Sequence, residues 1–577
     1  MTHTAHRIFA WGTALFVAFL LLPGVATADG FRSAKDLLHP VLGKSGMVAA
    51  QEAHATRVGV DILQRGGNAV DAAVAIGFAL AVTLPRAGNL GGGGFMMVHD
   101  AKSKKTVAID YREKAPSAAT ADLFLDDKGD VDKKRARFSH LSVGVPGTVA
   151  GLALALKRYG TMSLQEVIAP ALRLASDGFL VSDDMAKQID RRKKRFANWP
   201  STAAIFLRPD GEALRPGDRL VQPDLALSLK LIAEQGADAF YRGAIAERLV
   251  ADMKANGGLI TKADLAAYKP VERQPVVGSY RGYEIRSMPP PSSGGIHLVQ
   301  ILNILEEYDI AASGHNSAAT LHVMAEAMRR AYADRSQHLG DPDYWDVPQK
   351  GLLSKKYAAQ LRTGIDPAKA TPSAQVAPGN PRPYDSPDTT HYTVIDRFGN
   401  VVSNTYTLNF SYGTGIVAAG TGILLNNEMD DFAAKPGVPN AFGLLGGEAN
   451  AIEGGKRPLS SMTPTIVLRD GEPFLATGSP GGSRIITAVL QVLMNVIDHR
   501  MNVAEASSAP RMHHQWLPDV MRLEEGFSPD TRRLLKDKGH KVEIGRSMGS
   551  VQSIMRMDGK LFGASDPRRP DALTLGF

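Results

Sequence analysis

Three stretches of the chain have the continuous or periodic hydrophobicity of helices. Ala69–Leu84 (AVDAAVAIGFALAVTL) follows a Gly-Gly-Asn start and is apolar nearly all round, which predicts a buried helix. Thr320–Ser336 (TLHVMAEAMRRAYADRS) mixes apolar and charged positions at helical spacing, which predicts an amphipathic helix. Ser483–Asp498 is the third, and it begins directly behind Gly481 and Gly482.

Short apolar runs on either side of turn residues predict β-hairpins. The predicted hairpins are Phe95–Asp100 with Thr106–Arg112, His391–Asp396 with Val401–Leu408, Thr463–Leu468 with Phe474–Gly478, and Val551–Met555 with Leu561–Ala564. Three of the four fall after residue 388, whereas the part before it is mostly helical in pattern. We therefore expect an α+β protein in which helical layers cover a mainly antiparallel sheet.

Two proline-rich segments interrupt these elements. Met288–Gly295 (MPPPSSGG) is the first. The second, Ala377–Pro387 (APGNPRPYDSP), has the composition of an exposed, extended linker. It separates the mostly helical part, from about Asp29 to Asp388, from the hairpin-rich part that follows.

The first 28 residues have the pattern of a secretory signal peptide. Arg7 precedes an apolar run from Ile8 to Leu22, Pro23-Gly24 ends the run, and Ala26-Thr27-Ala28 offers the small residues that a signal peptidase reads. A membrane anchor needs about 20 apolar residues, and this run is shorter. We expect cleavage after Ala28 and export, with the bacterial periplasm as the destination.

Composition excludes several kinds of chemistry. The 577 residues include 66 Lys and Arg, 59 Asp and Glu and no cysteine. Disulfides, thiolate nucleophiles and cysteine-ligated metals are therefore ruled out, and a net charge of +7 does not call for a nucleic-acid partner. The sequence contains no HExxH, no GxxxxGK[ST] and no GxSxG motif. We expect a nucleophile that carries oxygen or nitrogen, and neither a metal nor a cofactor.

Two local clusters have ordinary explanations. The basic run Arg191–Arg195 (RRKKR) is expected to be a solvated helix face rather than a binding site. His513 and His514 are adjacent, so on a strand they would point to opposite faces and could not chelate one ion. We expect them to be loop histidines.

The most informative stretch begins where the proline-rich linker meets a predicted strand, at Asp388-Thr389-Thr390-His391-Tyr392. Strands often begin with threonine, so this stretch alone has little weight. Together with other runs it resembles the bacterial γ-glutamyltranspeptidases over essentially the whole chain after residue 28. The runs that carry the resemblance are GGNAVDAA from Gly66, NLGGG from Asn89, DYRE from Asp110, PPSSGG from Pro290, NTYTLN from Asn404, GTG from Gly413, LNNEMDDF from Leu425, KRPLSSMTPT from Lys456 and GSPGGSR from Gly478.

Membership in this family implies an N-terminal-nucleophile hydrolase with a four-layer αββα fold. By resemblance the precursor cuts itself between Asp388 and Thr389, giving a large subunit of residues 29–388 and a small subunit of residues 389–577 that form a heterodimer. Asp388 replaces the more familiar amide, which is expected to alter the rate of processing and not its chemistry.

The resemblance implies that Thr389 is the nucleophile. Self-cleavage exposes an α-amine on the same residue, with a reference pKa of about 7.7–8.0, which can take the hydroxyl proton. Thr407 matches the threonine that positions this nucleophile. Gly481 and Gly482 match the oxyanion hole, because a turn without side chains presents backbone N–H groups to the developing charge. His391, two residues after Thr389, is the rival base.

The implied donors are γ-glutamyl compounds such as glutathione, and the acceptors are amino acids, peptides or water. The donor's α-carboxylate and α-ammonium need opposite charges. The residues that match the family's carboxylate clamp are Arg112, Ser460 and Ser461, and those that match its ammonium site are Asn409, Glu428 and Asp431.

One lid residue departs from the family and two other functions compete. Many bacterial members have tyrosine in the lid loop where this chain has Phe442, whose ring can shield the pocket but has no hydroxyl to latch onto Asn409. The first alternative is a cephalosporin or glutaryl acylase of the same superfamily, against which Asn409, Glu428 and Asp431 argue. The second is a catalytically dead periplasmic binding protein, against which Thr389 and Thr407 argue.

Overall fold

The computed structural model describes residues 38–381 and 391–577. The expected signal peptide, residues 1–28, and the residues of the expected cleavage site, Asp388 and Thr389, lie outside this part. No helix in the described ranges is both long enough and apolar enough to cross a membrane.

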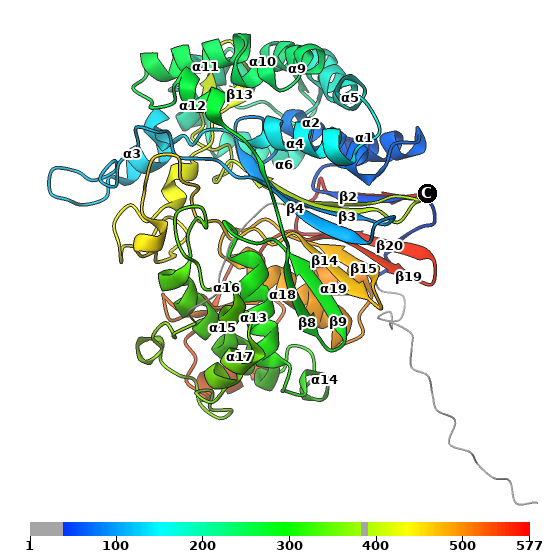
Figure 1. The fold of residues 1–577 in the computed structure, drawn as a ribbon, viewed down its shortest axis with the longest axis vertical. Helices are drawn as coiled ribbons and strands as arrows, with labels where there is room; N and C mark the ends of the chain where they lie inside the picture. The colour runs from blue at the N-terminus through cyan, green and yellow to red at the C-terminus, as the bar shows by residue number, and fades with distance from the viewer. Residues whose placement is uncertain (1–37, 382–390) are drawn as a thin grey trace, which may run out of the picture.

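Two seven-stranded antiparallel sheets form the centre of the molecule (Figure 1). The first has the order β21 (Leu573–Gly576), β2 (Met47–Ala50), β10 (Tyr392–Ile395), β11 (Val401–Thr407), β3 (Gly93–Asp100), β4 (Lys105–Tyr111) and β7 (Val271–Arg273). The second has the order β1 (Val41–Gly43), β20 (Lys560–Ser565), β19 (Gln552–Met557), β15 (Glu472–Thr477), β14 (Thr465–Arg469), β9 (Tyr283–Ser287) and β8 (Val276–Tyr280). All four predicted hairpins are confirmed.

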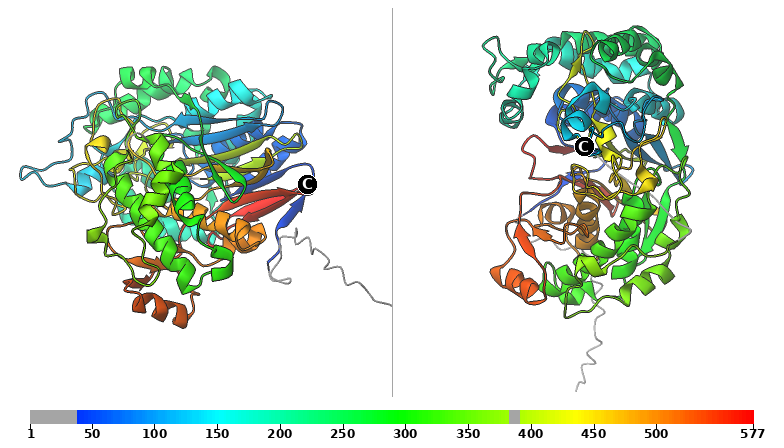
Figure 2. Two further views of the ribbon diagram at one scale, coloured as in Figure 1. Left: turned by 60° about the horizontal axis from the view of Figure 1, so that its bottom comes forward. Right: turned by 90° about the vertical axis from the view of Figure 1, so that its left-hand side faces the viewer.

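Helices cover the outer face of each sheet, which confirms the expected αββα order of layers (Figures 1 and 2). The layer over the first sheet contains α1 (Ala53–Gln64), α2 (Ala69–Thr83), α4 (Thr148–Tyr159), α5 (Leu164–Asp177), α6 (Asp183–Asp190), α9 (Pro223–Gln235), α10 (Asp238–Tyr241), α11 (Ala244–Ala255) and α12 (Lys262–Ala267). The layer over the second contains α13 (Gly294–Leu305), α14 (Ile310–Ser313), α15 (Ala318–His338), α16 (Gln349–Leu352), α17 (Lys355–Arg362), α18 (Arg484–Ile497), α19 (Val503–Ser508) and α20 (Pro529–Asp537).

The space between the sheets is filled by side chains from both. Met47, Phe95 and Ile395 from the first sheet lie in one apolar cluster with Ile466 and Ile554 from the second, all essentially inaccessible to solvent. Alternate residues of a strand point to opposite faces, so the other faces of the two sheets are free to pack against the helical layers. The two sheets therefore hold each other in place at the centre of the fold.

Helix α2 is the buried helix that the sequence predicts. All of its residues are buried, and its N-terminus carries a capping box in which Asn68 and Asp71 satisfy each other's backbone N–H groups. The Ala69 N–H donates to the Asp396 carboxylate at 2.9 Å. This bond ties the helix to the turn between β10 and β11.

The chain's last strand completes the first sheet beside β2. β21 pairs with β2 from Met47 opposite Gly576 to Ala50 opposite Leu573. The Phe577 carbonyl accepts hydrogen bonds from the Lys44 and Ser45 N–H groups at 2.8 and 2.6 Å. β2 thus has β21 on one side and β10 on the other.

Two expectations about polar residues are wrong. Helix α15 is not amphipathic, because it is buried on nearly all sides, charged residues included, and these residues have hydrogen-bond partners within the protein. Its Glu326 accepts from Arg330 at 2.7 Å and also from Arg329. The expectation of loop histidines is wrong for His513, which lies on the short strand β16 (Met512–His513), whereas His514 follows the strand and both side chains are buried.

Because Glu326 is the shared partner of two buried arginines, Glu326→Gln is expected to destabilise the protein strongly. Removing one member of a buried ion pair leaves uncompensated charge and costs about 3–5 kcal/mol. Urea unfolding followed by circular dichroism measures the change. Glu472→Gln, which breaks the exposed Lys104 pair, is the control and should unfold near the wild-type midpoint. Equal midpoints for the two variants would contradict the assignment.

Candidate active site

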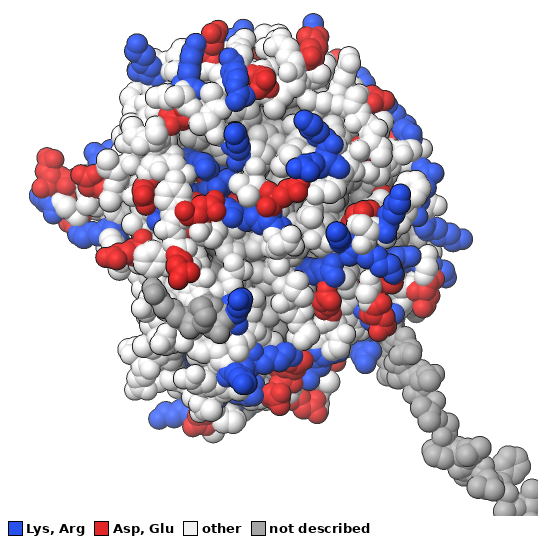
Figure 3. Space-filling view, in the orientation of Figure 1, with Lys and Arg blue, Asp and Glu red and all other residues white. Residues whose placement is uncertain are grey.

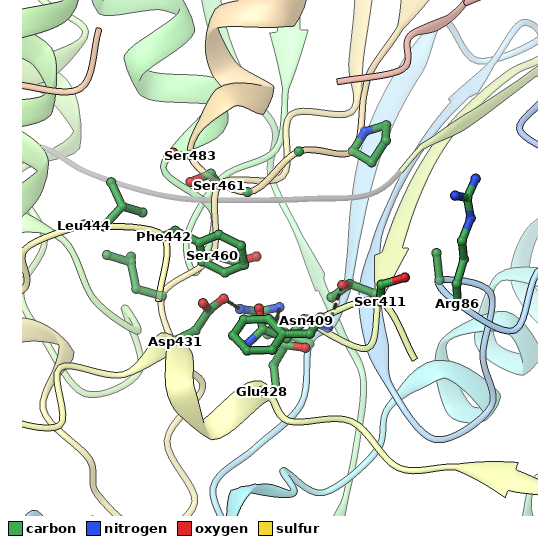
Figure 4. Close-up of a pocket in the computed structure, with 18 of the residues that line it drawn as sticks. Arg86, Asn409, Ser411, Glu428, Asp431, Phe442, Leu444, Ser460, Ser461 and Ser483 are labelled. Atoms are coloured by element: carbon green, nitrogen blue, oxygen red, sulfur yellow. Dashed lines mark hydrogen bonds and ion pairs between the residues drawn. The ribbon is translucent and has the colours of Figure 1, made fainter. Parts of the chain in front are cut away.

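The residues that the sequence predicts for the active site line one cavity of about 480 Å³ (Figure 4). It lies where β4 and β11 end, beside the short helix Glu428–Asp431 and the turn before α18. Thr389 lies outside the described residues, and the other ten predicted residues all line the cavity. They are Arg112, Thr407, Asn409, Glu428, Asp431, Phe442, Ser460, Ser461, Gly481 and Gly482.

Arg112 lines the cavity and is fully buried. Its Nη2 donates to Asp431 Oδ2 at 2.7 Å, its Nη1 donates to Glu428, and its Nε donates to the Pro458 carbonyl at 3.3 Å. The guanidinium expected to bind a substrate carboxylate is thus also the partner of the two acids expected to bind an ammonium. We call Glu428 and Asp431 the acidic end.

The acidic end and its surroundings contain more carboxyl groups than Arg112 can satisfy. Glu113 is a third buried carboxylate, with its Oε2 3.7 Å from Arg112 Nη1. Both Glu113 oxygens and Glu428 Oε2 are buried without a hydrogen-bond donor among the described residues. Burial raises the pKa of Glu113 to about 7 and raises the pKa of Glu428 and Asp431 as well. An added ammonium group would donate hydrogen bonds to these oxygens and favour the ionised carboxylates.

Glu113 is part of the run DYRE, but the sequence alone predicts no role for it at the site. The sequence feature that could have indicated such a role is its position next to Arg112. Arg335, which also lines the cavity and lowers the pKa of Asp431, had no such signal, because α15 brings it there from a distant part of the sequence.

Hydroxyl groups near Arg112 are free to bind a ligand. Ser460 and Ser461 are buried side chains that line the cavity, and neither hydroxyl has a hydrogen-bond partner among the described residues. Thr407, the last residue of β11, accepts a hydrogen bond at its Oγ1 from the Asn409 N–H at 2.8 Å. The Asn409 side chain donates to the Asn427 carbonyl at 2.9 Å, which fixes its orientation.

Gly481 and Gly482 form a turn that requires glycine. Their φ angles are +139° and +57°, a region that side-chain-bearing residues rarely adopt. In the described part of the chain neither N–H group donates a hydrogen bond to the protein, and the turn leads into the N-terminus of α18. The turn therefore offers two N–H groups to an oxygen that gains negative charge.

Phe442 covers the glycine turn. A Cβ atom at Gly482 would lie 2.6 Å from Phe442 Cδ1, so the ring packs directly on this glycine. Phe410 meets the ring edge-on at 5.6 Å between centroids, and Gln515 Nε2 donates to the Phe442 carbonyl at 3.2 Å. The lid is held by aromatic packing and a backbone contact, without a side-chain hydroxyl.

His391 is placed poorly for the role of a base. It is 3% exposed, its Nδ1 lies 3.2 Å from Thr405 Oγ1, and its Nε2 contacts Thr393 Oγ1. Burial lowers its pKa to about 3. The ring is therefore neutral at physiological pH, and neighbouring hydroxyls occupy both of its nitrogens.

The other end of the cavity is lined by arginines. Two of them belong to the basic run Arg191–Arg195, which the sequence predicts to be a solvated helix face. Arg191 and Lys194 are exposed, but Arg192 and Arg195 are half-buried and line the cavity. Helix α7 (Lys193–Phe196) begins within this run, and a spacing of three residues sets two side chains on one helical face. That spacing was the signal that the sequence-based interpretation missed.

In the residues that the structure describes, no group of three or more His, Asp or Glu side chains is arranged to hold a metal ion. Lys, Arg, Asp and Glu are interspersed on the face of the molecule in Figure 3. The separation of charge inside the cavity therefore contrasts with the mixed surface around it.

Comparison with known proteins places this cavity in a family. The gamma-glutamyltranspeptidase family profile matches residues 55–575. The chain is 59% identical over 545 residues to the glutathione hydrolase proenzyme of Escherichia coli K12, covering 94% of each chain. A solved cephalosporin acylase from Bacillus halodurans superposes with a TM-score of 0.84 at 29% identity, over 93% of this chain and 97% of that one. Helicobacter pylori gamma-glutamyltranspeptidase matches at 48% identity with a TM-score of 0.57, over 57% of this chain and 94% of the matched one. The protein belongs to the gamma-glutamyltranspeptidase family.

Proposed function

We propose that this protein is a γ-glutamyltransferase and glutathione hydrolase that cuts itself between Asp388 and Thr389. The observation that carries the proposal is the acidic end of the cavity. Its two carboxylates and the buried Glu113 share Arg112, and among the described residues both Glu113 oxygens and Glu428 Oε2 lack a donor. A γ-glutamyl donor has an α-ammonium group that meets this need. Its α-carboxylate can accept hydrogen bonds from Arg112, Ser460 and Ser461.

The sheet register supports Thr389 as the nucleophile. β10 and β11 pair with Tyr392 opposite Asn404 and Ile395 opposite Val401. β10 begins three residues after position 389 in the sequence, and β11 ends at Thr407, which lines the cavity. After self-cleavage the new N-terminus would thus begin beside the residue proposed to position it.

The first chemical step is acylation. The Thr389 hydroxyl oxygen attacks the γ-carbonyl carbon of the donor while its proton passes to the Thr389 α-amine. The N–H groups of Gly481 and Gly482 stabilise the negative oxygen of the tetrahedral intermediate. The protonated α-amine of Thr389 then gives this proton to the leaving amine as the intermediate collapses. A γ-glutamyl ester remains on Thr389.

The second step releases the acyl group. An acceptor amine or water loses a proton to the Thr389 α-amine as it attacks the ester carbonyl, and the same N–H pair again stabilises the oxyanion. The proton then returns to the Thr389 oxygen. Transfer and hydrolysis differ only in which nucleophile attacks.

The charge of the acidic end separates this function from acylase activity. A glutaryl or related acyl group has no α-ammonium, so binding it would leave Glu428 and Asp431 without a cation from the substrate. The likeness to an acylase structure is a likeness of fold and supports no particular substrate. Glutathione with and without an added amino-acid acceptor, assayed against glutaryl amides, tests the choice.

The proposed location and assembly follow from the sequence. Residues 1–28 would direct export to the periplasm and be removed. Residues 29–388 and 389–577 would remain together as a heterodimer of large and small subunits after the cut.

Thr389→Ala is expected to abolish both self-cleavage and activity, because it removes the attacking oxygen. Intact-mass measurement of the purified wild-type protein should give two chains, the smaller beginning with Thr389, whereas the variant should give one. A dead binding protein would also give one chain in the wild type. A wild-type enzyme active as an uncut chain would contradict the mechanism.

Arg112→Lys is expected to lower kcat/KM for glutathione about tenfold or more. An ammonium cannot reproduce the paired hydrogen bonds of the guanidinium, and losing a charged hydrogen bond costs about 1.5–3 kcal/mol. Arg137→Lys is a matched control, because Arg137 pairs with Asp430 at 2.9 Å beside the cavity without lining it. Unchanged kinetics in a folded Arg112→Lys enzyme would remove Arg112 from the proposed site.

Activity is expected to rise with pH near the α-amine's reference range of about 7.7–8.0. His391, with a pKa lowered to about 3 by burial, is already neutral below this range. Its deprotonation therefore causes no increase in kcat/KM between about pH 7 and 8. We therefore expect His391→Asn to show the same increase of kcat/KM with pH as the wild type. Loss of this increase in a folded and correctly cleaved variant would transfer the role of base to His391.

A further inference from the structure

Four arginines gather at the end of the cavity away from the acidic end. Figure 4 shows Arg86 at one end and Asp431 at the other, with Ser411 between them. Arg192, Arg195 and Arg569 also line this region. We call Arg86, Arg192, Arg195 and Arg569 the arginine end.

Few acids balance these charges. Arg86 pairs with Asp184 at 3.1 Å, and the structure shows no acid paired with the other three in its described ranges. Asp566 is held by Arg511 and Arg568 at 2.7 and 3.1 Å. The arginine end therefore has an excess of positive charge.

Protein contacts fix these guanidinium groups but leave donors unused. Arg195 Nη2 donates to the Ser411 carbonyl at 3.1 Å, and its guanidinium lies 5.0 Å from the Phe138 ring centre. Arg192 lies 5.5 Å from the Tyr412 ring centre and donates to the Gln188 carbonyl. Arg86 Nη2, Arg195 Nε and Arg569 Nε are buried and have no hydrogen-bond acceptor in the part of the chain that the structure describes.

Mutual repulsion adds to this imbalance. Burial lowers the pKa of Arg192 and Arg569, and the charge of Arg86 lowers both further. Burial and the charge of Arg192 lower the pKa of Arg195 to about 10. Charges held together in this way bind an anion more favourably than the same arginines spread over a surface.

We propose that the arginine end binds the carboxylate of the leaving group and of the acceptor. The inference rests on the proposed function, in which the leaving amine departs from the face of the acyl carbon that the acceptor amine later attacks. Both molecules therefore extend from the reacting carbon away from the acidic end. An α-amino acid or a short peptide with a free C-terminus places its carboxylate among the arginines.

The acceptor pair glycylglycine and glycylglycinamide tests the proposal, because the two differ only in the terminal carboxylate. The measurement is the ratio of kcat/KM for the two acceptors, with a γ-glutamyl anilide as donor. We expect the wild type to favour the carboxylate about tenfold or more, and Arg569→Gln and Arg192→Gln to reduce this preference severalfold. A ratio cancels any general loss of activity.

Arg191→Gln is the matched control, since Arg191 is the exposed neighbour of Arg192 in the same basic run. It should keep the wild-type ratio. A full wild-type preference in the double variant Arg192→Gln with Arg569→Gln, or equal use of both acceptors by the wild type, would overturn the proposal. A wild-type protein that transfers nothing from the anilide would instead contradict the proposed function.

Discussion

The place of β10 in the middle of the first sheet is the constraint on which the active site depends. β2 and β11 pair with it on either side, and its side chains face α2 on one side and the second sheet on the other. A strand with neighbours on both edges cannot shift its register without turning its apolar residues the wrong way. The start of β10 is therefore held close to the cavity end of β11, where Thr407 and Asn409 are fixed.

Around that place the fold separates charge along one cavity. Carboxylates are concentrated at the acidic end and guanidinium groups at the other, with the glycine turn among the residues that line the same cavity. Each end is incomplete alone, since among the described residues buried oxygens lack donors at one end and buried nitrogens lack acceptors at the other. In the proposed function, a donor with an ammonium at one end and an acceptor or leaving group with a carboxylate at the other would complete both. The orientation of the substrate would then follow from electrostatics as well as from shape.

Local patterns in the sequence were enough to predict the hairpins, α2 and the αββα order of layers, because each depends on neighbouring residues or on a family resemblance. The same resemblance named ten described residues that the fold brings into one cavity. Charge patterns misled where tertiary packing decided the outcome. Glu326, Arg329 and Arg330 of α15 are buried and pair with one another, and two of the five residues in the basic run Arg191–Arg195 line the cavity. Contacts between distant segments, such as those that bring Arg335 and Arg569 to the cavity, leave no signal in the local sequence.

The last strand of the chain bears on when the protein can become active. β21 pairs with β2, and Phe577 fixes the turn before β2 through the Lys44 and Ser45 N–H groups. β2 in turn is one of the two strands that hold β10. The sheet that contains β10 is therefore complete only after residues 573–577 have been synthesised. If the proposed self-cleavage needs the complete sheet, it would follow the synthesis of both halves, and neither would be released without its partner.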